Sequence, residues 1–429
     1  MKPIWMVSRA FGLEPFQIIL KTLSDGTIRL KPKYSVKKTL HTYAVIFIMI
    51  VSFFISATRN KETFHESINV PGPKLQILRL LNLVSRYMAA LVSVTGMYMH
   101  GKSRLEIYQT FMEVDEMLSK HSRVNYRNWS KCCARHLAIM IFTLLAFTIA
   151  STVFATLHRD GSLRIIIQIV HFITDFVVFT TTASYINLIL LIYQRLKLIN
   201  EALQTHFDLI VMRVKPSTVN YFRRSTLNYI QESPQRPKNM IMNLNNRNSV
   251  DEGLLSDERA RLIHSMRRIY NKIYQISLII NKVYGVIVLF SIFSTFVTIT
   301  LSLYFGLKAG FGSITSPNDF NQKFQATTFF TWSLAYVVKT FAMLWACNAS
   351  TNETKRINDR IHHSLIHCGQ EQEKKTALKE FSSQITDCGM AFSGSGIITL
   401  DMPLLASMMG SVMSYLLVLL QLNPSETPR

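Results

Sequence analysis

Charged side chains are scarce in this chain, because Asp, Glu, Lys and Arg make up only 17% of its 429 residues. Soluble domains usually contain about a quarter charged residues. The hydrophobic residues, 48% of the total, gather in blocks of about twenty, the length that crosses a hydrocarbon core of about 30 Å. The composition therefore excludes an ordinary soluble domain and places the chain among membrane proteins.

Catalytic motifs are also missing from the sequence. It has no nucleophile elbow, no glycine-rich phosphate loop and no pair of acids at a useful spacing, so we expect neither an enzyme nor a cofactor. His363 and His367 lie four residues apart beside Cys368, a spacing compatible with a metal site. A packing face between helices explains them better, and we expect no metal. Residues 1–38 contain no recognisable cleavable signal peptide.

Seven apolar segments are long enough to span a membrane, and the fold class we predict is an all-α membrane protein with seven transmembrane helices. No internal repeat and no separate soluble domain is evident. The predicted spans are Leu40–Arg59, Leu75–Met99, His136–Leu157, Arg164–Tyr193, Gly285–Leu307, Thr327–Asn348 and Met402–Leu420.

Positive charge is distributed unevenly between the loops that join these spans. The amino-terminal tail and every second loop hold 36 Lys and Arg residues, whereas the other loops and the carboxyl-terminal tail hold 6. Positively charged loops stay on the cytoplasmic side, so we predict a cytoplasmic amino end and an extracellular carboxyl end. This orientation is the reverse of that of a G-protein-coupled receptor.

The predicted orientation gives the chain a simple plan. We expect the large loop to carry helical extensions of its neighbouring spans around a disordered loop near 213–258. We also expect all five cysteines to lie at or near the reducing cytosol as free thiols. The predicted regions are a cytoplasmic tail at 1–39, a six-helix bundle at 40–348, a cytosolic anchor segment at 349–401, the seventh helix at 402–422 and an extracellular tail at 423–429.

Two short features precede the last span. The stretch Phe392–Gly396 reads "FSGSG", which suits a hinge or a tight turn. Asp401 stands directly before Met402 and Pro403, the position of a helix N-cap. The same carboxylate would also favour cations if it stood at the inner mouth of a pore.

A few polar and charged residues lie inside the predicted spans. Arg86, Asp175 and Lys339 occupy the second, fourth and sixth spans, where charge is costly and usually faces protein or water. Arg86 and Asp175 could form a structural ion pair or contact a ligand, and these roles do not exclude each other. We predict an outward-opening ligand site with aromatic walls and a few polar anchors. Its candidate residues are Arg86, His171, Asp175, Trp332 and Tyr336.

The last span combines lipid-grade apolarity with a row of polar residues. Steps of four, three, four and three place the row on one helical face. Such a stripe must face protein or water, and one stripe cannot enclose a pore, so several copies would have to surround an axis. The row consists of Ser407, Ser411, Ser414, Val418 and Gln421.

The segment Ser414–Leu422, "SYLLVLLQL", resembles the signature of insect gustatory receptors: Thr-Tyr, five apolar residues, then Gln-Phe. Tyr415 and Gln421 match it, whereas Ser414 replaces Thr and Leu422 replaces Phe. The resemblance implies a tetrameric ligand-gated cation channel with a ligand site in the outer part of each subunit. The pore and gate residues it implies are Ser411, Ser414, Tyr415, Val418, Gln421 and Leu422.

The resemblance also sets the remaining expectations. We expect a multi-pass receptor in the plasma membrane of chemosensory neurons, partnered by membrane lipid and by gustatory receptor subunits in a homo- or heterotetramer, with no nucleic acid. Its tastant would be a sugar, a bitter substance or another plant compound. Leu416 stands where a major sugar-receptor branch often has Glu, which weighs mildly against that branch. The alternatives are an insect odorant receptor subunit, a metabotropic receptor or a transporter.

Overall fold

The computed structural model describes most of the chain as long helices. Between them lie segments that are outside the description, including the predicted third span, His136–Leu157. The described residues are 16–22, 28–34, 36–62, 73–120, 162–213, 239–315, 320–366 and 372–421.

The elements follow one another as a helical bundle with two small hairpins. The strands are β1 (Phe16–Thr22), β2 (Ile28–Tyr34), β3 (Ser393–Gly394) and β4 (Ile398–Thr399). The helices are α2 (Val36–Glu62), α4 (Pro73–Met99), α5 (Gly101–Ser119), α7 (Ser162–Arg213), α9 (Asn239–Thr315), α10 (Phe320–Ile366), α11 (Gln372–Asp387) and α12 (Met402–Gln421).

Within the described residues, six helices are long and apolar enough to cross a membrane. They coincide with six of the seven spans that the sequence predicted. The seventh, at 136–157, lies outside the described residues. Side chains such as Phe47, Phe54, Leu334 and Val338 are exposed on this single chain, as expected of surfaces that contact lipid or another subunit.

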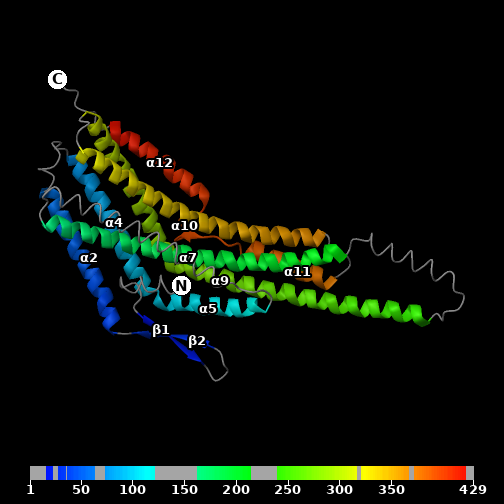
Figure 1. Ribbon diagram of the computed structural model, residues 1–429. Coiled ribbons are helices and arrows are strands. Elements are labelled where there is room, and N and C mark those ends of the chain that lie inside the picture. Colours follow the sequence, from blue (N-terminus) through cyan, green and yellow to red (C-terminus); the bar gives the residue numbers. More distant parts are fainter. Residues whose placement is uncertain are drawn as a thin grey trace.

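Three helices are far longer than a membrane crossing. Helices α7, α9 and α10 contain 52, 77 and 47 residues. At 1.5 Å per residue, even α10 is about 70 Å long, more than twice the thickness of a hydrocarbon core. Figure 1 shows these three running the length of the molecule, with α2, α4 and α12 beside one half and α5 and α11 beside the other. We call the second half the helical extension.

An apolar seam holds the helical extension together. The side chains that the sequence placed on one face of α9 are all buried, and the ring of Tyr270 packs 5.9 Å from that of Phe381 on α11. Charged side chains border the seam, because Arg195 on α7 donates from Nε and Nη2 to both oxygens of Asp115 on α5 at 2.9 Å. The seam residues on α9 are Leu262, Met266, Ile269, Ile273 and Ile276.

Helix α9 begins at Asn239, inside the stretch near 213–258 that the sequence predicted to be disordered. The prediction and the structure therefore differ for residues 239–258, whereas 214–238 lie outside the described residues. The last proline of the stretch, Pro237, precedes the helix. Adding residues to an existing helix costs much less than nucleating one, so the packed part of α9 can propagate toward Asn239 even through polar sequence.

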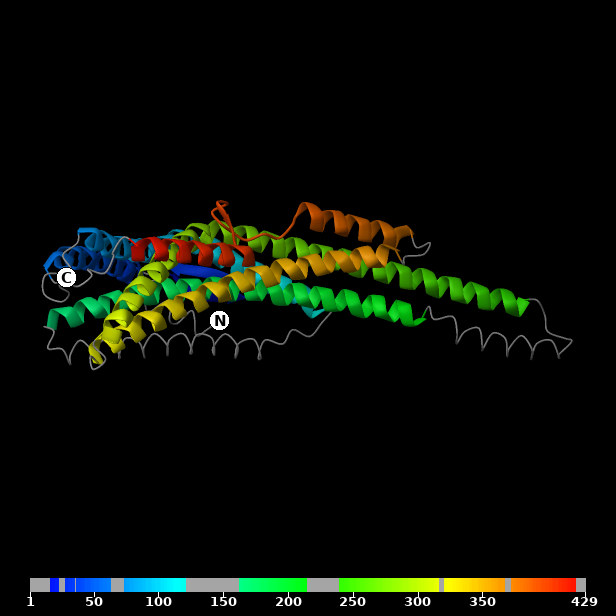
Figure 2. The same ribbon diagram turned by 90° about the horizontal axis from the view of Figure 1, so that it is seen from above.

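A short hairpin joins α11 to α12 across the middle of the bundle. Strands β3 and β4 pair antiparallel, and the Ile397 amide donates to the carbonyl of Gly394 at 3.0 Å. Ser395 and Gly396 both have positive φ, 56° and 73°, as in the tight turns that suit hairpins. The tight turn predicted from "FSGSG" is thus confirmed. Figure 2 shows α11, the hairpin and α12 following one another along α9.

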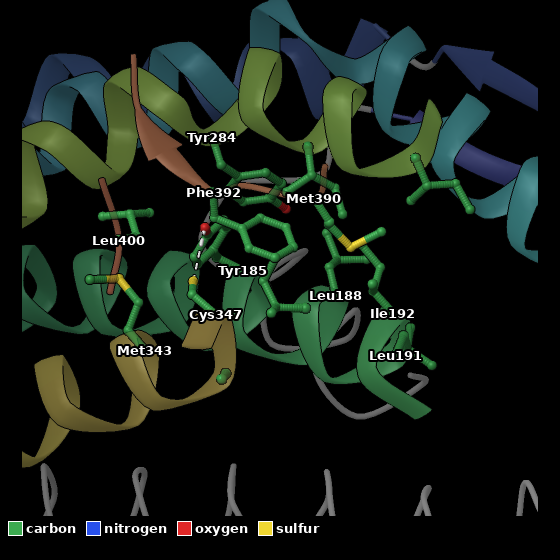
Figure 3. Close-up of a cluster of buried hydrophobic side chains, with 14 of the residues drawn as sticks. Tyr185, Leu188, Leu191, Ile192, Tyr284, Met343, Cys347, Met390, Phe392 and Leu400 are labelled. Atoms are coloured by element: carbon green, nitrogen blue, oxygen red, sulfur yellow. Dashed lines mark hydrogen bonds between the residues drawn. The ribbon is translucent and has the colours of Figure 1, made fainter. Parts of the chain in front are cut away.

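The hairpin segment is anchored in a buried apolar cluster. Figure 3 shows Met390, Phe392 and Leu400 inserted between α9 on one side and α7 and α10 on the other. All three are at most 4% exposed, and the Leu400 amide donates to the Phe392 carbonyl at 2.9 Å. In the same cluster Tyr185 and Cys347 form a hydrogen bond of 3.4 Å. The start of α12 is therefore fixed to the bundle core.

The tip of this hairpin rests on α9 at a glycine. A Cβ atom added to Gly285 would lie 2.9 Å from the backbone nitrogen of Ser395, too close for any side chain. After the hairpin, Asp401 Oδ1 accepts a hydrogen bond of 3.1 Å from the Leu404 amide, which confirms the predicted N-cap of α12.

The hairpin at the amino end was not expected from the sequence. Strands β1 and β2 pair antiparallel, with Phe16 opposite Tyr34 and Thr22 opposite Ile28. The two strands lie within the segment predicted as a cytoplasmic tail. The fold is therefore mostly helical, with two short hairpins added to the predicted all-α bundle.

Candidate functional site

Asp175 ties three helices together inside the bundle. It lies on α7 with 2% of its surface exposed. Arg86 on α4 donates from Nε to Oδ1 at 2.9 Å and from a second guanidinium nitrogen to Oδ2. Tyr336 on α10 donates its hydroxyl hydrogen to Oδ1 at 2.9 Å. The predicted ion pair between Arg86 and Asp175 is confirmed, while a ligand contact by the same residues stays a prediction.

Aromatic rings enclose the neighbourhood of Tyr336. Its ring packs edge-on against Trp332, with 5.5 Å between centroids, and against Phe179 at 5.2 Å. Trp332 and Tyr336 are one helical turn apart on α10, and both are buried. Three of the five predicted ligand-site residues, Asp175, Trp332 and Tyr336, therefore lie in one contiguous group with Arg86.

Lys339 belongs to the same group, although the sequence-based list of site residues omitted it. Its Nζ lies 4.7 Å from the ring centroid of Tyr336 and 4.9 Å from that of Phe179. It also donates to Ser291 Oγ on α9 at 3.4 Å, and 8% of the residue is exposed. The sequence did signal it, because a lysine in the middle of a span is rarely without a role.

His171 contacts a different set of rings. It packs edge-on against Tyr87 on α4 at 5.7 Å, and Tyr87 packs against Phe53 on α2 at 5.6 Å. Its Nδ1 atom is buried with no hydrogen-bond partner within the described residues. His171 is therefore joined to the Asp175 group by the chain on which both lie, and by no hydrogen bond between the two.

Helix α12 packs on the bundle through one face alone. Met408, Val412 and Leu416 are at most 7% exposed, at steps of four residues. The predicted polar row lies on the opposite side: Ser407, Ser414 and Gln421 are exposed and Val418 is 49% exposed. Ser411 is half-buried, and its hydroxyl hydrogen bonds to the carbonyl of Ser407 at 3.0 Å.

Two residues of the predicted gate need separate mention. Tyr415 is 57% exposed, and its ring packs edge-on against Phe296 of α9 at 5.8 Å. It therefore lies beside the bundle contact and apart from the polar row. Leu422 lies outside the described residues. The single chain leaves the polar row without a covering element among the described residues, as a helix facing an assembly axis would require.

Comparison with known proteins identifies the family. The family model described as 7tm Chemosensory receptor matches residues 1–425. The chain belongs to this chemosensory receptor family. Two curated relatives from Drosophila melanogaster are named "Putative gustatory receptor 28b" and "Putative gustatory receptor 2a"; each is 22% identical to the chain, over 173 and 184 residues. Those alignments cover 40% and 39% of this chain, and the chain spans only 37% and 42% of those two relatives.

Solved structures resemble the receptor over nearly its whole length. The insect olfactory receptor OR5 from Machilis hrabei matches with a TM-score of 0.59 at 13% identity, and the same receptor in complex with eugenol matches with 0.58 at 14%. Each match covers 98% of this chain and 97% of the other. At such low identity the likeness establishes the fold. A chemosensory receptor family agrees with the prediction of a multi-pass membrane protein that is not an enzyme.

Proposed function

We propose that this chemosensory receptor is a gustatory receptor that acts as a tastant-gated, non-selective cation channel. Several copies, by the resemblance four, surround a pore lined by α12. The tastant binds in the outer half of each helix bundle near Asp175, Trp332 and Tyr336. The receptor lies in the plasma membrane of chemosensory neurons, with its amino end and its helical extension in the cytosol and its carboxyl end outside.

The observation that carries this proposal is the two-sided character of α12. One face is buried against the bundle at Met408, Val412 and Leu416, and the opposite face presents hydroxyls and an amide to the surroundings. Lipid is a poor environment for Gln421, whereas a water-filled axis shared with other copies is a favourable one. The Ser hydroxyls bond to their own helix, so they can line a pore without a fixed partner.

Cysteine accessibility tests this arrangement. In a background without the five native cysteines, Ser414→Cys and Gln421→Cys should react with a small cationic thiol reagent and lose current, faster when tastant is present. The matched controls Val412→Cys and Leu416→Cys, on the buried face, should react slowly or not at all. Equal reactivity on both faces would contradict a pore along α12.

An odorant receptor subunit is the second candidate, favoured by the olfactory receptor structures of the same fold. The names of the curated relatives favour the gustatory assignment. Expressing the receptor alone separates the two: current evoked by tastants without any partner subunit supports a gustatory channel. Current that appears only with a partner subunit and volatile compounds would support the odorant assignment.

A further inference from the structure

The charges around Asp175 do not balance. Asp175 is the only Asp or Glu in the seven predicted spans. Its two oxygens already accept from Arg86 and Tyr336. Lys339 adds a second buried cation to the same group of side chains, and within the described residues it forms no ion pair of its own. One carboxylate thus serves two cationic side chains.

The contacts of Lys339 only partly replace a counter-ion. The faces of Phe179 and Tyr336 attract the ammonium group, and Ser291 Oγ accepts a long hydrogen bond of 3.4 Å. An ammonium group has three hydrogen atoms to donate. At this depth in a bundle a cation without a compensating anion is strongly disfavoured, so the group is incomplete as it stands.

The helices packed around Lys339 offer no other acid. Helix α9 contributes Ser291, whose neighbour across the contact is Thr182 of α7 at 3.4 Å between the hydroxyl oxygens. Helix α4 contributes Arg86, and the predicted span on α10 has no other charged residue besides Lys339 itself. The surroundings are therefore hydroxyl groups, aromatic faces and positive charge, which together suit an anion with a flat apolar body.

We propose that Lys339 recognises a singly charged anion, the carboxylate of a small organic acid, with Ser291 as a second hydrogen-bond donor and the rings of Phe179 and Tyr336 against the body of the acid. The proposal rests on the ligand site of the proposed function and narrows its ligand class. Chloride could supply the same charge without an apolar body, so the experiment must distinguish the two sources.

The test uses matched acids and amides on the purified full-length receptor in a chloride-free sulfate buffer. Benzoate is compared with benzamide, cinnamate with cinnamamide and hexanoate with hexanamide, and the measured quantity is the midpoint of thermal unfolding. At least one acid should raise the midpoint by about 2 °C or more above its amide, since a ligand that binds only the folded state stabilises it. If no acid exceeds its amide in the wild-type receptor, the proposal is overturned without any variant being needed.

Variants then assign the effect to Lys339. Lys339→Met should remove the difference between acid and amide, and Lys339→Arg should keep most of it. The matched control is Lys323→Met, an exposed lysine near the start of the same helix, which should leave the difference unchanged. A difference that survives Lys339→Met would place the anion elsewhere and refute the assignment.

Two further arms separate the outcomes. Adding sodium chloride in place of sulfate should stabilise the receptor less than the organic acid does; equal stabilisation would make a bound chloride ion the occupant and overturn the organic-acid class. Whole-cell current distinguishes this inference from the proposed function. Current gated only by neutral compounds, with no stabilisation by acids, would reject the anion site and keep the channel, whereas acid binding with no current would do the reverse.

Discussion

At the residue scale, the ion pair between Arg86 and Asp175 is the contact on which the bundle interior depends most. Both side chains are largely buried, and the carboxylate also accepts from Tyr336. Removing one partner of a buried pair leaves the other charge unpaired, at a cost of about 3–5 kcal/mol. Replacing both by apolar groups of similar size is often nearly neutral.

We therefore expect Asp175→Leu and Arg86→Met each to lower the thermal midpoint and the surface level of the receptor, and the double variant to recover much of both. The measurement is a double-mutant cycle on detergent-solubilised protein. Lys197→Met serves as the control, because the pair it breaks with Glu201 is exposed and worth about 0–1 kcal/mol. Single variants as stable as the wild type would mean that the pair contributes little.

Sequence analysis found this pair because charges inside spans are few and their partners are limited. The same reasoning did not bring Ser291 and Phe179 into the site, because serine and phenylalanine occur throughout the spans and nothing in their spacing sets these two apart. His171 was grouped with Asp175 from its position, one turn away on α7, yet the structure packs it against Tyr87. Helical spacing places a residue on a face but does not say which neighbour that face meets.

At the element scale, the β3–β4 hairpin fixes where α12 begins. Its turn needs positive φ at two successive positions, and Ser395 occupies the first of them. The sequence predicted the turn from its glycines, but the contact of the tip with Gly285, 110 residues earlier, depends on tertiary packing that no local pattern encodes.

Substitutions in the turn should have opposite effects. Gly396→Ala should destabilise the receptor by about 1–2 kcal/mol, because a Cβ disfavours left-handed backbone. Ser395→Gly should be neutral or slightly stabilising, since glycine adopts the same φ without that cost. Thermal midpoints of the two solubilised variants give the comparison, and similar losses in both would show that the positive φ is not what the turn requires.

The seat of the hairpin on α9 gives a functional prediction. Gly285→Ala forces the backbone of Ser395 away from α9 and should shift the start of α12, so we expect tastant-evoked current to fall several-fold at unchanged surface level. Gly310→Ala on the same helix is the control, since an added Cβ there has no atom within 4 Å. Patch-clamp recording with surface labelling checks both. Equal currents from the two variants would separate the hairpin from gating.

At the scale of the whole molecule, the charge asymmetry of the loops predicts the orientation. With 36 Lys and Arg residues on one side and 6 on the other, a tag at the carboxyl end should bind antibody on intact cells. A tag at the amino end should bind only after permeabilisation. The reverse pattern would contradict the topology and, with it, the cytosolic placement of the helical extension.

The order in which the helical extension is synthesised follows from its contacts. Tyr270 on α9 packs against Phe381 on α11, and Arg267 donates to Gln384. A ribosome working at about 5–20 residues per second completes α11 on the order of 5–20 s after that part of α9. During this interval the apolar seam of α9 is without its cover, while the spans that follow must still enter the membrane. The nascent receptor therefore depends on chaperones that shield this seam until α11 emerges.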